Sequence, residues 1–241
     1  MESFSLQSKP AEIKAVLNVQ PAVSMMECEI PLPMISILNR YIDQNRGSAK
    51  SYADNLVGQI NQHSESSQLA LNQKDKVPKS FVKILEKLAS SYIATMGYNK
   101  YSVDCHDIWT VHSYAGDYNP LHNHYVESKI GLSCILYLKL SEEMVNNKDN
   151  AVDLKNASGN TDGYTFFNWG SSGTHDVDMM RYSTETYVKP VVGKLVMFPH
   201  WLKHSVNPFF GEGERRTLSA NFNVRTNDTL RTQICQLGVK T

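Results

Sequence analysis

The sequence predicts an α+β fold that is mainly β, in which a β-sandwich or barrel carries helices on its outside. Three observations lead to this class. Apolar residues with helical spacing occur within the first 100 residues. From residue 101 the chain consists of short segments rich in β-branched and aromatic residues. Gly, Asn, Asp and Pro separate those segments, as turns between strands require.

The first 50 residues predict strand and then helix. Residues 11–30 mix short apolar pieces with Pro21, which favours one or two short strands over a helix. A helix is expected next, followed by Gly47 as its stop. Its apolar face is formed by residues at positions i, i+3, i+4, i+7 and i+8, namely Met34, Ile37, Leu38, Tyr41 and Ile42.

A second helix is predicted before the β-rich part begins. Residues 61–76 are polar and indicate a surface loop or a weak helix. The clearest helix of the chain is predicted over 79–97, where Gly97 ends it. Its apolar face consists of Phe81, Ile84, Leu85, Leu88 and Tyr92.

The β-rich part is predicted to contain two long insertions. Its strands are expected in the segments DIWTVHSY, IGLSCILYL, GYTFFNW, TETYVKP, KLVMFP and RTLSANFNV. The polar stretches 141–162 and 170–186 indicate insertions, and loops of this length on a β scaffold often carry substrate contacts. We expect a single domain over 1–241, with an N-terminal support region, 1–100, and a core, 101–226.

Charge and cysteine content argue against several classes of protein. The 24 Lys and Arg residues balance 24 Asp and Glu residues, and the basic stripe of a nucleic-acid binder is missing. Four cysteines lie scattered without CxxC spacing, which favours free thiols in a reducing compartment. No signal-peptide pattern is visible, and no apolar run reaches the ~20 residues that span a bilayer. We expect a soluble, cytoplasmic protein that binds neither nucleic acid nor membrane; the sequence does not indicate its oligomeric state.

A pair of histidines one residue apart predicts a metal site. His122 and His124 precede an apolar run, and residues i and i+2 of a strand point to one face, so both rings can reach a single ion. A third ligand should come from a distant strand, for which His204 is the candidate and His200 a weaker one. The other four histidines are interpreted as structural or solvated: His63, His106, His112 and His175.

These motifs resemble the iron(II)- and 2-oxoglutarate-dependent oxygenases. The resemblance rests on Tyr114-x-Gly116, His122-x-His124, LSCILYL, GKLVMFPHWLKHSV and ERRTLSANFNV, and it covers residues 103–224. It is strongest to a group of oxygenases from bacteria and phages that is related to the prolyl hydroxylases. The family pattern is His-x-Asp/Glu, a distal His and an Arg about eleven positions later, and His204 and Arg215 stand eleven positions apart.

The resemblance implies a double-stranded β-helix, or jelly roll, that binds Fe(II) through His122, His124 and His204. 2-Oxoglutarate and O2 would take the remaining coordination positions, and the product would be a hydroxylated amino acid, peptidyl residue or small metabolite. His124 departs from the pattern because it replaces the usual carboxylate. The resemblance also implies that Tyr137 binds the co-substrate and that Tyr114 lies near the metal and the target.

Strand alternation assigns the remaining site residues. Along RRTLSAN, the side chains of Arg215, Thr217, Ser219 and Asn221 share one polar face that suits the floor of a cavity. Arg215 can then bind the distal carboxylate of 2-oxoglutarate through its planar fork, with Ser219 beside it. Arg216 is expected on the outer face, exposed to solvent.

Three other functions remain open at this point. A cupin-like protein would use Glu127 as a fourth ligand, a three-histidine zinc protein would activate water, and a binding module would retain the barrel without catalysis. The substrate, small molecule or peptide, is not fixed by these motifs. One insertion contains a cluster of polar residues that either contact a polar substrate or form a solvated loop, namely His175, Asp176, Asp178, Arg181 and Tyr182.

Overall fold

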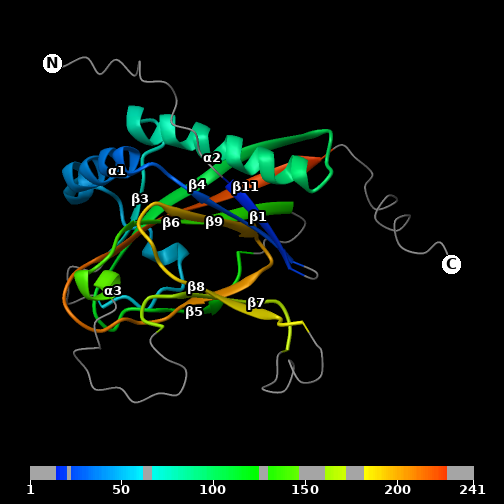
Figure 1. Ribbon diagram of the computed structural model, residues 1–241. Helices are drawn as coiled ribbons and strands as arrows, with labels where there is room; N and C mark the ends of the chain where they lie inside the picture. Colours follow the sequence, from blue (N-terminus) through cyan, green and yellow to red (C-terminus); the bar gives the residue numbers. More distant parts are fainter. Residues whose placement is uncertain are drawn as a thin grey trace.

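Two antiparallel sheets face each other in the computed structural model, which describes residues 15–20, 23–61, 67–124, 130–146, 161–171 and 182–226 (Figure 1). The larger sheet has the strand order β1 (Ala15–Gln20), β2 (Val23–Glu29), β9 (Lys194–Pro199), β6 (Ile130–Lys139), β11 (Arg215–Thr226), β4 (Tyr101–Ser113) and β3 (Ser67–Ala70). The smaller sheet has the order β5 (Asn119–His122), β10 (Lys203–Val206), β7 (Thr165–Asn168) and β8 (Glu185–Val188). This is the arrangement of a double-stranded β-helix, as predicted.

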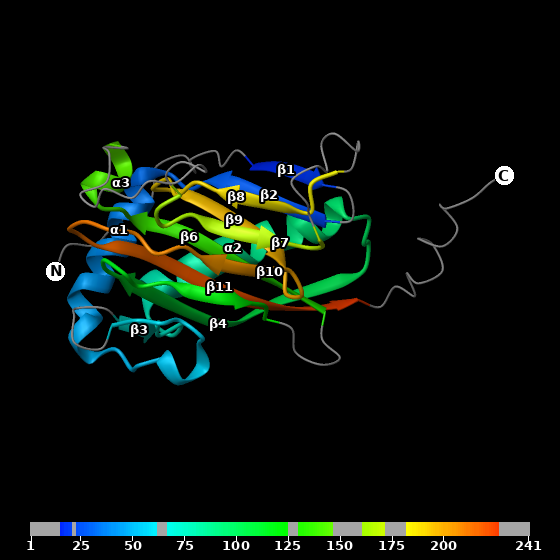
Figure 2. The same ribbon diagram turned by 90° about the horizontal axis from the view of Figure 1, so that it is seen from below.

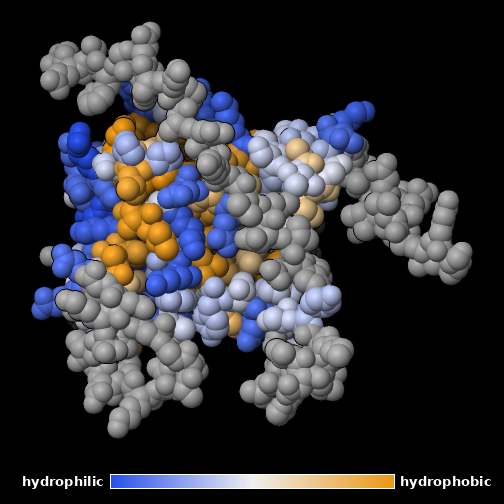
Figure 3. Space-filling view, in the orientation of Figure 1, coloured by the Kyte–Doolittle hydropathy of each residue, from blue (hydrophilic) through white to orange (hydrophobic). Residues whose placement is uncertain are grey.

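Both faces of the larger sheet are buried, because helices cover its outer face and the smaller sheet covers its inner face. Alternation along β6 shows the two environments: Leu136 packs in the helix-facing core, and Ile135 packs in the core between the sheets. Figure 3 shows hydrophobic residues gathered between the helical layer and the smaller sheet on the side seen in Figure 1.

The two predicted helices are confirmed. The first, α1 (Leu32–Asn45), follows Pro31 and passes into a short 3-10 helix, η1 (Arg46–Ser48), at the expected stop. The second, α2 (Lys76–Thr95), ends before Gly97, whose φ of 89° is a left-handed conformation that glycine adopts without strain. Leu38 and Leu85 are fully enclosed against the sheet, and burial of such a side chain contributes ~1.5–3 kcal/mol.

The expectation of a loop or weak helix over 61–76 is wrong for its central residues. Residues 67–70 form β3, which pairs with the edge of β4 in the register Leu69↔Thr110. The pairing depends on backbone hydrogen bonds to a strand 40 residues away, which the local composition does not reveal.

The insertions are described only at their ends. The first begins with the short helix α3 (Glu142–Asn146), and residues 147–160 and 172–181 lie outside the described part of the chain. His63, Glu127, His175, Asp176, Asp178, Arg181 and Cys235 also lie outside it. Cys28, Cys105 and Cys134 are buried free thiols. Among the described helices, none combines the length and apolar character needed to cross a membrane.

Candidate active site

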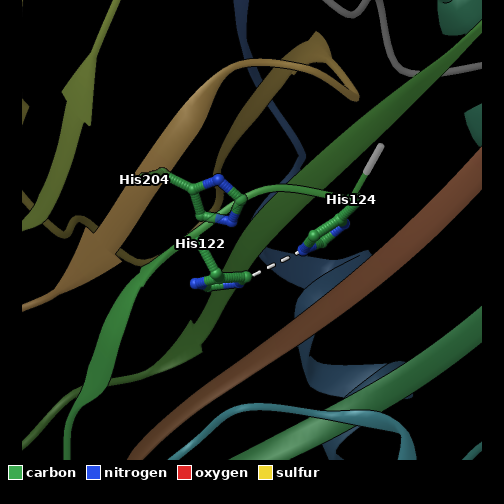
Figure 4. Close-up of side chains that lie close together, drawn as sticks. All are labelled: His122, His124 and His204. Carbon is green, nitrogen blue, oxygen red and sulfur yellow. Dashed lines mark hydrogen bonds between the residues drawn. The ribbon is translucent and has the colours of Figure 1, made fainter. Parts of the chain in front are cut away.

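Three histidine rings point toward one another where β5 and β10 pair (Figure 4). His122 ends β5 and lies directly opposite His204 of β10, with ring centroids 4.2 Å apart. His124 follows the end of β5, where its backbone N–H donates to the carbonyl of His200 at 2.9 Å. One ring nitrogen from each histidine lies within 4.8 Å of the others, and the Nε2 atoms of His122 and His124 are 3.3 Å apart.

Each of the three rings has its Nδ1 atom against an oxygen acceptor. Nδ1 of His122 lies 2.7 Å from the carbonyl oxygen of Pro120, and Nδ1 of His204 lies 3.1 Å from that of Leu202. Nδ1 of His124 has two such partners. A ring that donates from Nδ1 presents the lone pair of Nε2, so this arrangement selects the tautomer that binds a metal.

The hydrogen-bond partners of His124 come from two neighbouring strands. Its Nδ1 lies 2.8 Å from Asn221 Oδ1 of β11 and 2.8 Å from Ser133 Oγ of β6. The Ser133 hydroxyl also donates to Asn221 Oδ1 at 2.8 Å. Both partners are uncharged, so the ring is oriented by neutral acceptors.

Burial keeps all three imidazoles neutral. It lowers the pKa of His124 to about 4, lowers that of His122, and lowers that of His204 well below its usual value. With Nδ1 of each ring donating, the Nε2 atoms of His122 and His124, 3.3 Å apart and joined by the dashed line in Figure 4, turn their lone pairs toward one another, and a cation between them would satisfy both. Two nitrogens that bind one metal at ~2.1 Å are about 3.0–3.4 Å apart, which fits this spacing.

The histidines border a cavity of about 360 Å³ whose floor is the predicted polar face of β11. Arg215, Thr217, Ser219 and Asn221 all line it, in agreement with the expected alternation. Its other lining residues are Tyr52, Asn55, Leu56, Val57, Asp107, Trp109, Val111, Asn119, His122, Asn123, His124, Ile135, His204 and Val206.

Arg215 is a buried cation with donor capacity to spare. Its Nε donates to the carbonyl of Gly163 at 3.1 Å, and among the described residues its Nη2 has no hydrogen-bond partner. Burial lowers the pKa of the guanidinium. Burial of a charged donor without a hydrogen-bond partner costs free energy unless an anion binds to it. This cavity therefore suits a ligand with a carboxylate.

The expectation of a solvated Arg216 is wrong. Its side chain does lie on the outer face of β11, but α1 covers that face and leaves it 2% exposed. Its guanidinium donates to Glu214, to Asp43 Oδ1 at 2.7 Å and to Asn39 Oδ1 at 3.0 Å. His112 joins the same network, with Nδ1 2.6 Å from Glu214 Oε1, so this histidine is structural as predicted.

Three other predicted residues lie at the edge of the site or outside it. Tyr137 is completely buried and does not line the cavity; its ring centroid lies 5.3 Å from Cζ of Arg215, and its hydroxyl bonds Thr165 at 2.7 Å. Tyr114 follows the end of β4 in a turn, where its N–H donates to Asp117 at 2.8 Å, and it is not among the cavity residues. His200 is buried beside Gly131, and its ring lies 6.4 Å from that of His124, outside the ligand cluster.

Sequence reasoning missed one wall of the cavity. Tyr52, Asn55, Leu56 and Val57 come from the N-terminal region, which was expected only to support the core. Figure 2 shows this segment and β3 beside β4. No local pattern predicts that contact. The alternation of Asp107, Trp109 and Val111 along β4 was visible in the sequence and would have placed their side chains on one face.

Comparisons with known proteins give one family match and several similar folds. Residues 107–221 match the family described as "Putative 2OG-Fe(II) oxygenase". Among curated proteins, none matches the sequence of this chain. The fold is similar to that of a prolyl-4-hydroxylase from Pseudomonas putida, with a TM-score of 0.53 and 12% identity over 85% of this chain and 93% of that one.

Two further structures share the fold. HygX from Streptomyces hygroscopicus, solved with nickel and 2-oxoglutarate bound, has a TM-score of 0.52 and 9% identity over 83% of this chain and 82% of its own. The carbocyclase SnoK from nogalamycin biosynthesis, described as non-heme and alpha ketoglutarate dependent, has a TM-score of 0.53 and 10% identity over 89% and 86%.

Proposed function

We propose that this chain is an Fe(II)- and 2-oxoglutarate-dependent hydroxylase, because its residues 107–221 match the 2OG-Fe(II) oxygenase family. The overall reaction is R–H + 2-oxoglutarate + O2 → R–OH + succinate + CO2. Bound iron would supply the activation of O2, which side chains cannot provide. The substrate would be an amino acid, a peptidyl residue or a small metabolite.

The observation that carries this proposal is the set of hydrogen bonds behind the three imidazoles. All three Nδ1 atoms face oxygen acceptors, which leaves the Nε2 atoms free to bind a metal, and one nitrogen of each ring lies within 4.8 Å of the others. Three imidazoles leave both charges of a divalent ion uncompensated. A dianionic keto acid supplies that compensation, whereas in most members of this family a carboxylate ligand supplies part of it.

The chain's own residues would bind the co-substrate at its far end. Arg215 Nη2 offers a free donor to the distal carboxylate, and Ser219 and Thr217 line the same floor. Tyr137 does not line the cavity, and we propose that it holds the Arg215 guanidinium in place through the face of its ring. The apolar side chains of Ile135 and Val206 limit water in the cavity.

An anaerobic titration tests the proposal. One equivalent of Fe(II) followed by 2-oxoglutarate should produce a metal-to-ligand charge-transfer absorption, and admission of O2 should convert 2-oxoglutarate into succinate. Folded protein that binds iron and 2-oxoglutarate without this absorption would contradict the proposal. Retention of zinc alone would favour a hydrolytic three-histidine centre, and binding of no metal would favour a binding module.

A further inference from the structure

Strand register places the two charged residues of the cavity at its opposite ends. Along the floor, Arg215 pairs with Ser113 of β4, and Asn221 pairs with Asp107. Arg215 and Asn221 are six residue steps apart along an extended strand, a distance of about 20 Å. Among the described residues that line the cavity, Asp107 is the one carboxylate and Arg215 the one Arg or Lys.

The histidines proposed to bind the metal do not lie midway between these two ends. His124 bonds Asn221, which is the residue opposite Asp107, so His124 lies in the Asp107 half of the cavity. A co-substrate that spans from the histidines to Arg215 fills the other half. The Asp107 half is then the space left for the substrate, and in this respect the inference rests on the proposed function.

The Asp107 carboxylate is positioned by two donors and remains partly open. His106 Nδ1 lies 2.7 Å from its Oδ2, and the side chain is 35% exposed. Burial and a hydrogen bond to this carboxylate raise the pKa of Tyr52 to about 12, so the tyrosine hydroxyl stays protonated and donates to Asp107. Neither neighbour is a Lys or Arg that would cancel the negative charge permanently.

An apolar wall stands beside this carboxylate. The rings of Tyr52 and Trp109 stack with centroids 5.5 Å apart, and the Trp109 ring lies 6.0 Å from that of His124. Leu56 and Val57 extend the wall. Backbone hydrogen bonds fix the segment at both ends, from Tyr52 N to Gln68 O at 2.8 Å and from Gln59 N to Tyr118 O at 2.8 Å.

We propose that the substrate carries an ammonium or guanidinium group at the end of an apolar stem, such as a lysyl- or arginyl-like side chain. Asp107 binds the charged head, and the Tyr52–Trp109 wall packs against the stem. The stem then passes the His124 ring, and a C–H bond of the stem is the one presented to the metal.

Matched probes test this inference by calorimetry on the anaerobic Fe(II)–2-oxoglutarate complex. The cationic probes are Nα-acetyl-lysine methylamide and Nα-acetyl-arginine methylamide; the neutral ones are the corresponding Nε-acetyl-lysine and citrulline compounds. The cationic probes should bind roughly tenfold more tightly than their neutral partners, or better, as one charge-assisted hydrogen bond provides. Asp107→Asn should remove the preference, and Asp107→Glu should retain part of it.

The control variant is Asp104→Asn, which removes the same charge from an exposed position on the same strand and should leave the preference intact. Equal binding of neutral and cationic probes, no binding of cationic probes at millimolar concentration, or a preference that survives Asp107→Asn would overturn the inference. The charge-transfer absorption is recorded on the same samples. Its absence contradicts the proposed function, whereas its presence without the preference contradicts this inference alone.

Discussion

The pair of acceptors behind His124 predicts a non-additive effect on iron affinity. His124 has one Nδ1–H and two acceptors at 2.8 Å, Ser133 Oγ and Asn221 Oδ1. In Ser133→Ala the bond to Asn221 remains, and in Asn221→Ala the Ser133 hydroxyl, freed from donating to Asn221, can accept instead. Each single variant should therefore weaken iron binding by at most about fivefold, within the ~1 kcal/mol of one neutral hydrogen bond.

The double variant should cost far more than the two single variants together. It leaves a buried Nδ1–H without an acceptor, which costs about 1–3 kcal/mol or moves the proton to Nε2 and removes the ligand. Iron affinity should fall about 10- to 100-fold, the range found when the residues that orient metal ligands are lost. Competition between the protein and a chelator for Fe(II), with the Co(II) absorption spectrum as a second readout, measures the change.

Two results would exclude these roles of Ser133 and Asn221. If Asn221→Ala alone costs as much as the double variant, Ser133 does not serve as an alternative acceptor. If the double variant binds iron like the wild type, His124 is not held as a ligand through Nδ1. Thermal unfolding of each variant separates these outcomes from a general loss of structure.

Three more changes have defined outcomes. Arg215→Gln should weaken 2-oxoglutarate binding by about 10- to 150-fold, from a charge-assisted bond of ~1.5–3 kcal/mol, while iron binding persists in calorimetry. Glu214→Gln should lower the free energy of unfolding by about 3 kcal/mol at pH 7 in urea titrations, because it breaks a buried ion pair. Gly131→Ala should cost about 1–3 kcal/mol, because its Cβ would lie 2.6 Å from the Phe222 carbonyl oxygen and against the His200 ring.

The Glu214 prediction has a pH dependence of known sign. Burial raises the pKa of this carboxyl, but hydrogen bonds from His112, Arg216 and Lys139 outweigh burial and bring it well below its usual value. A depressed carboxyl pKa stabilises the fold above the unfolded-state value of ~4.3, and this contribution is lost as the pH falls below it. The stability difference between wild type and Glu214→Gln should therefore shrink below about pH 4.

Each of these outcomes has a counterpart that would contradict it. Arg216→Gln is the matched control for Arg215→Gln: it should lower stability and leave 2-oxoglutarate affinity unchanged. Loss of 2-oxoglutarate affinity in Arg216→Gln but not in Arg215→Gln would show that Arg216 binds the co-substrate. A Glu214 difference that grows at low pH would exclude the ion pair as its source. A Gly131→Ala protein as stable as the wild type would show that the strand shifts without cost.

The sequence sufficed where a short-range rule controls the outcome. Strand alternation placed Arg215 and Ser219 on the cavity floor, and helical spacing located α1 and α2. The His122–His204 pairing followed from residue type and from the resemblance, since a metal ligand set needs a second strand.

Contacts between segments far apart in the sequence determine the features that the sequence did not predict. Arg216 was expected in solvent because the sequence of its own strand does not reveal that α1 lies over it. Its partner on α1, Asp43, is 173 residues away in the sequence. Tyr114 was expected on a strand, but β4 ends at Ser113 and Asp117 captures its N–H in a turn. The wall at Tyr52 depends on the pairing of β3 with β4, which no local composition encodes.

The most direct measurement is a crystal structure of the anaerobic complex with Fe(II) and 2-oxoglutarate, with the metal located by anomalous scattering at the iron edge. We expect one iron bound by Nε2 of His122, His124 and His204, chelated by the keto-acid end of 2-oxoglutarate, with the distal carboxylate on Arg215. Iron bound elsewhere or through Nδ1, or a co-substrate whose distal carboxylate avoids Arg215, would contradict it.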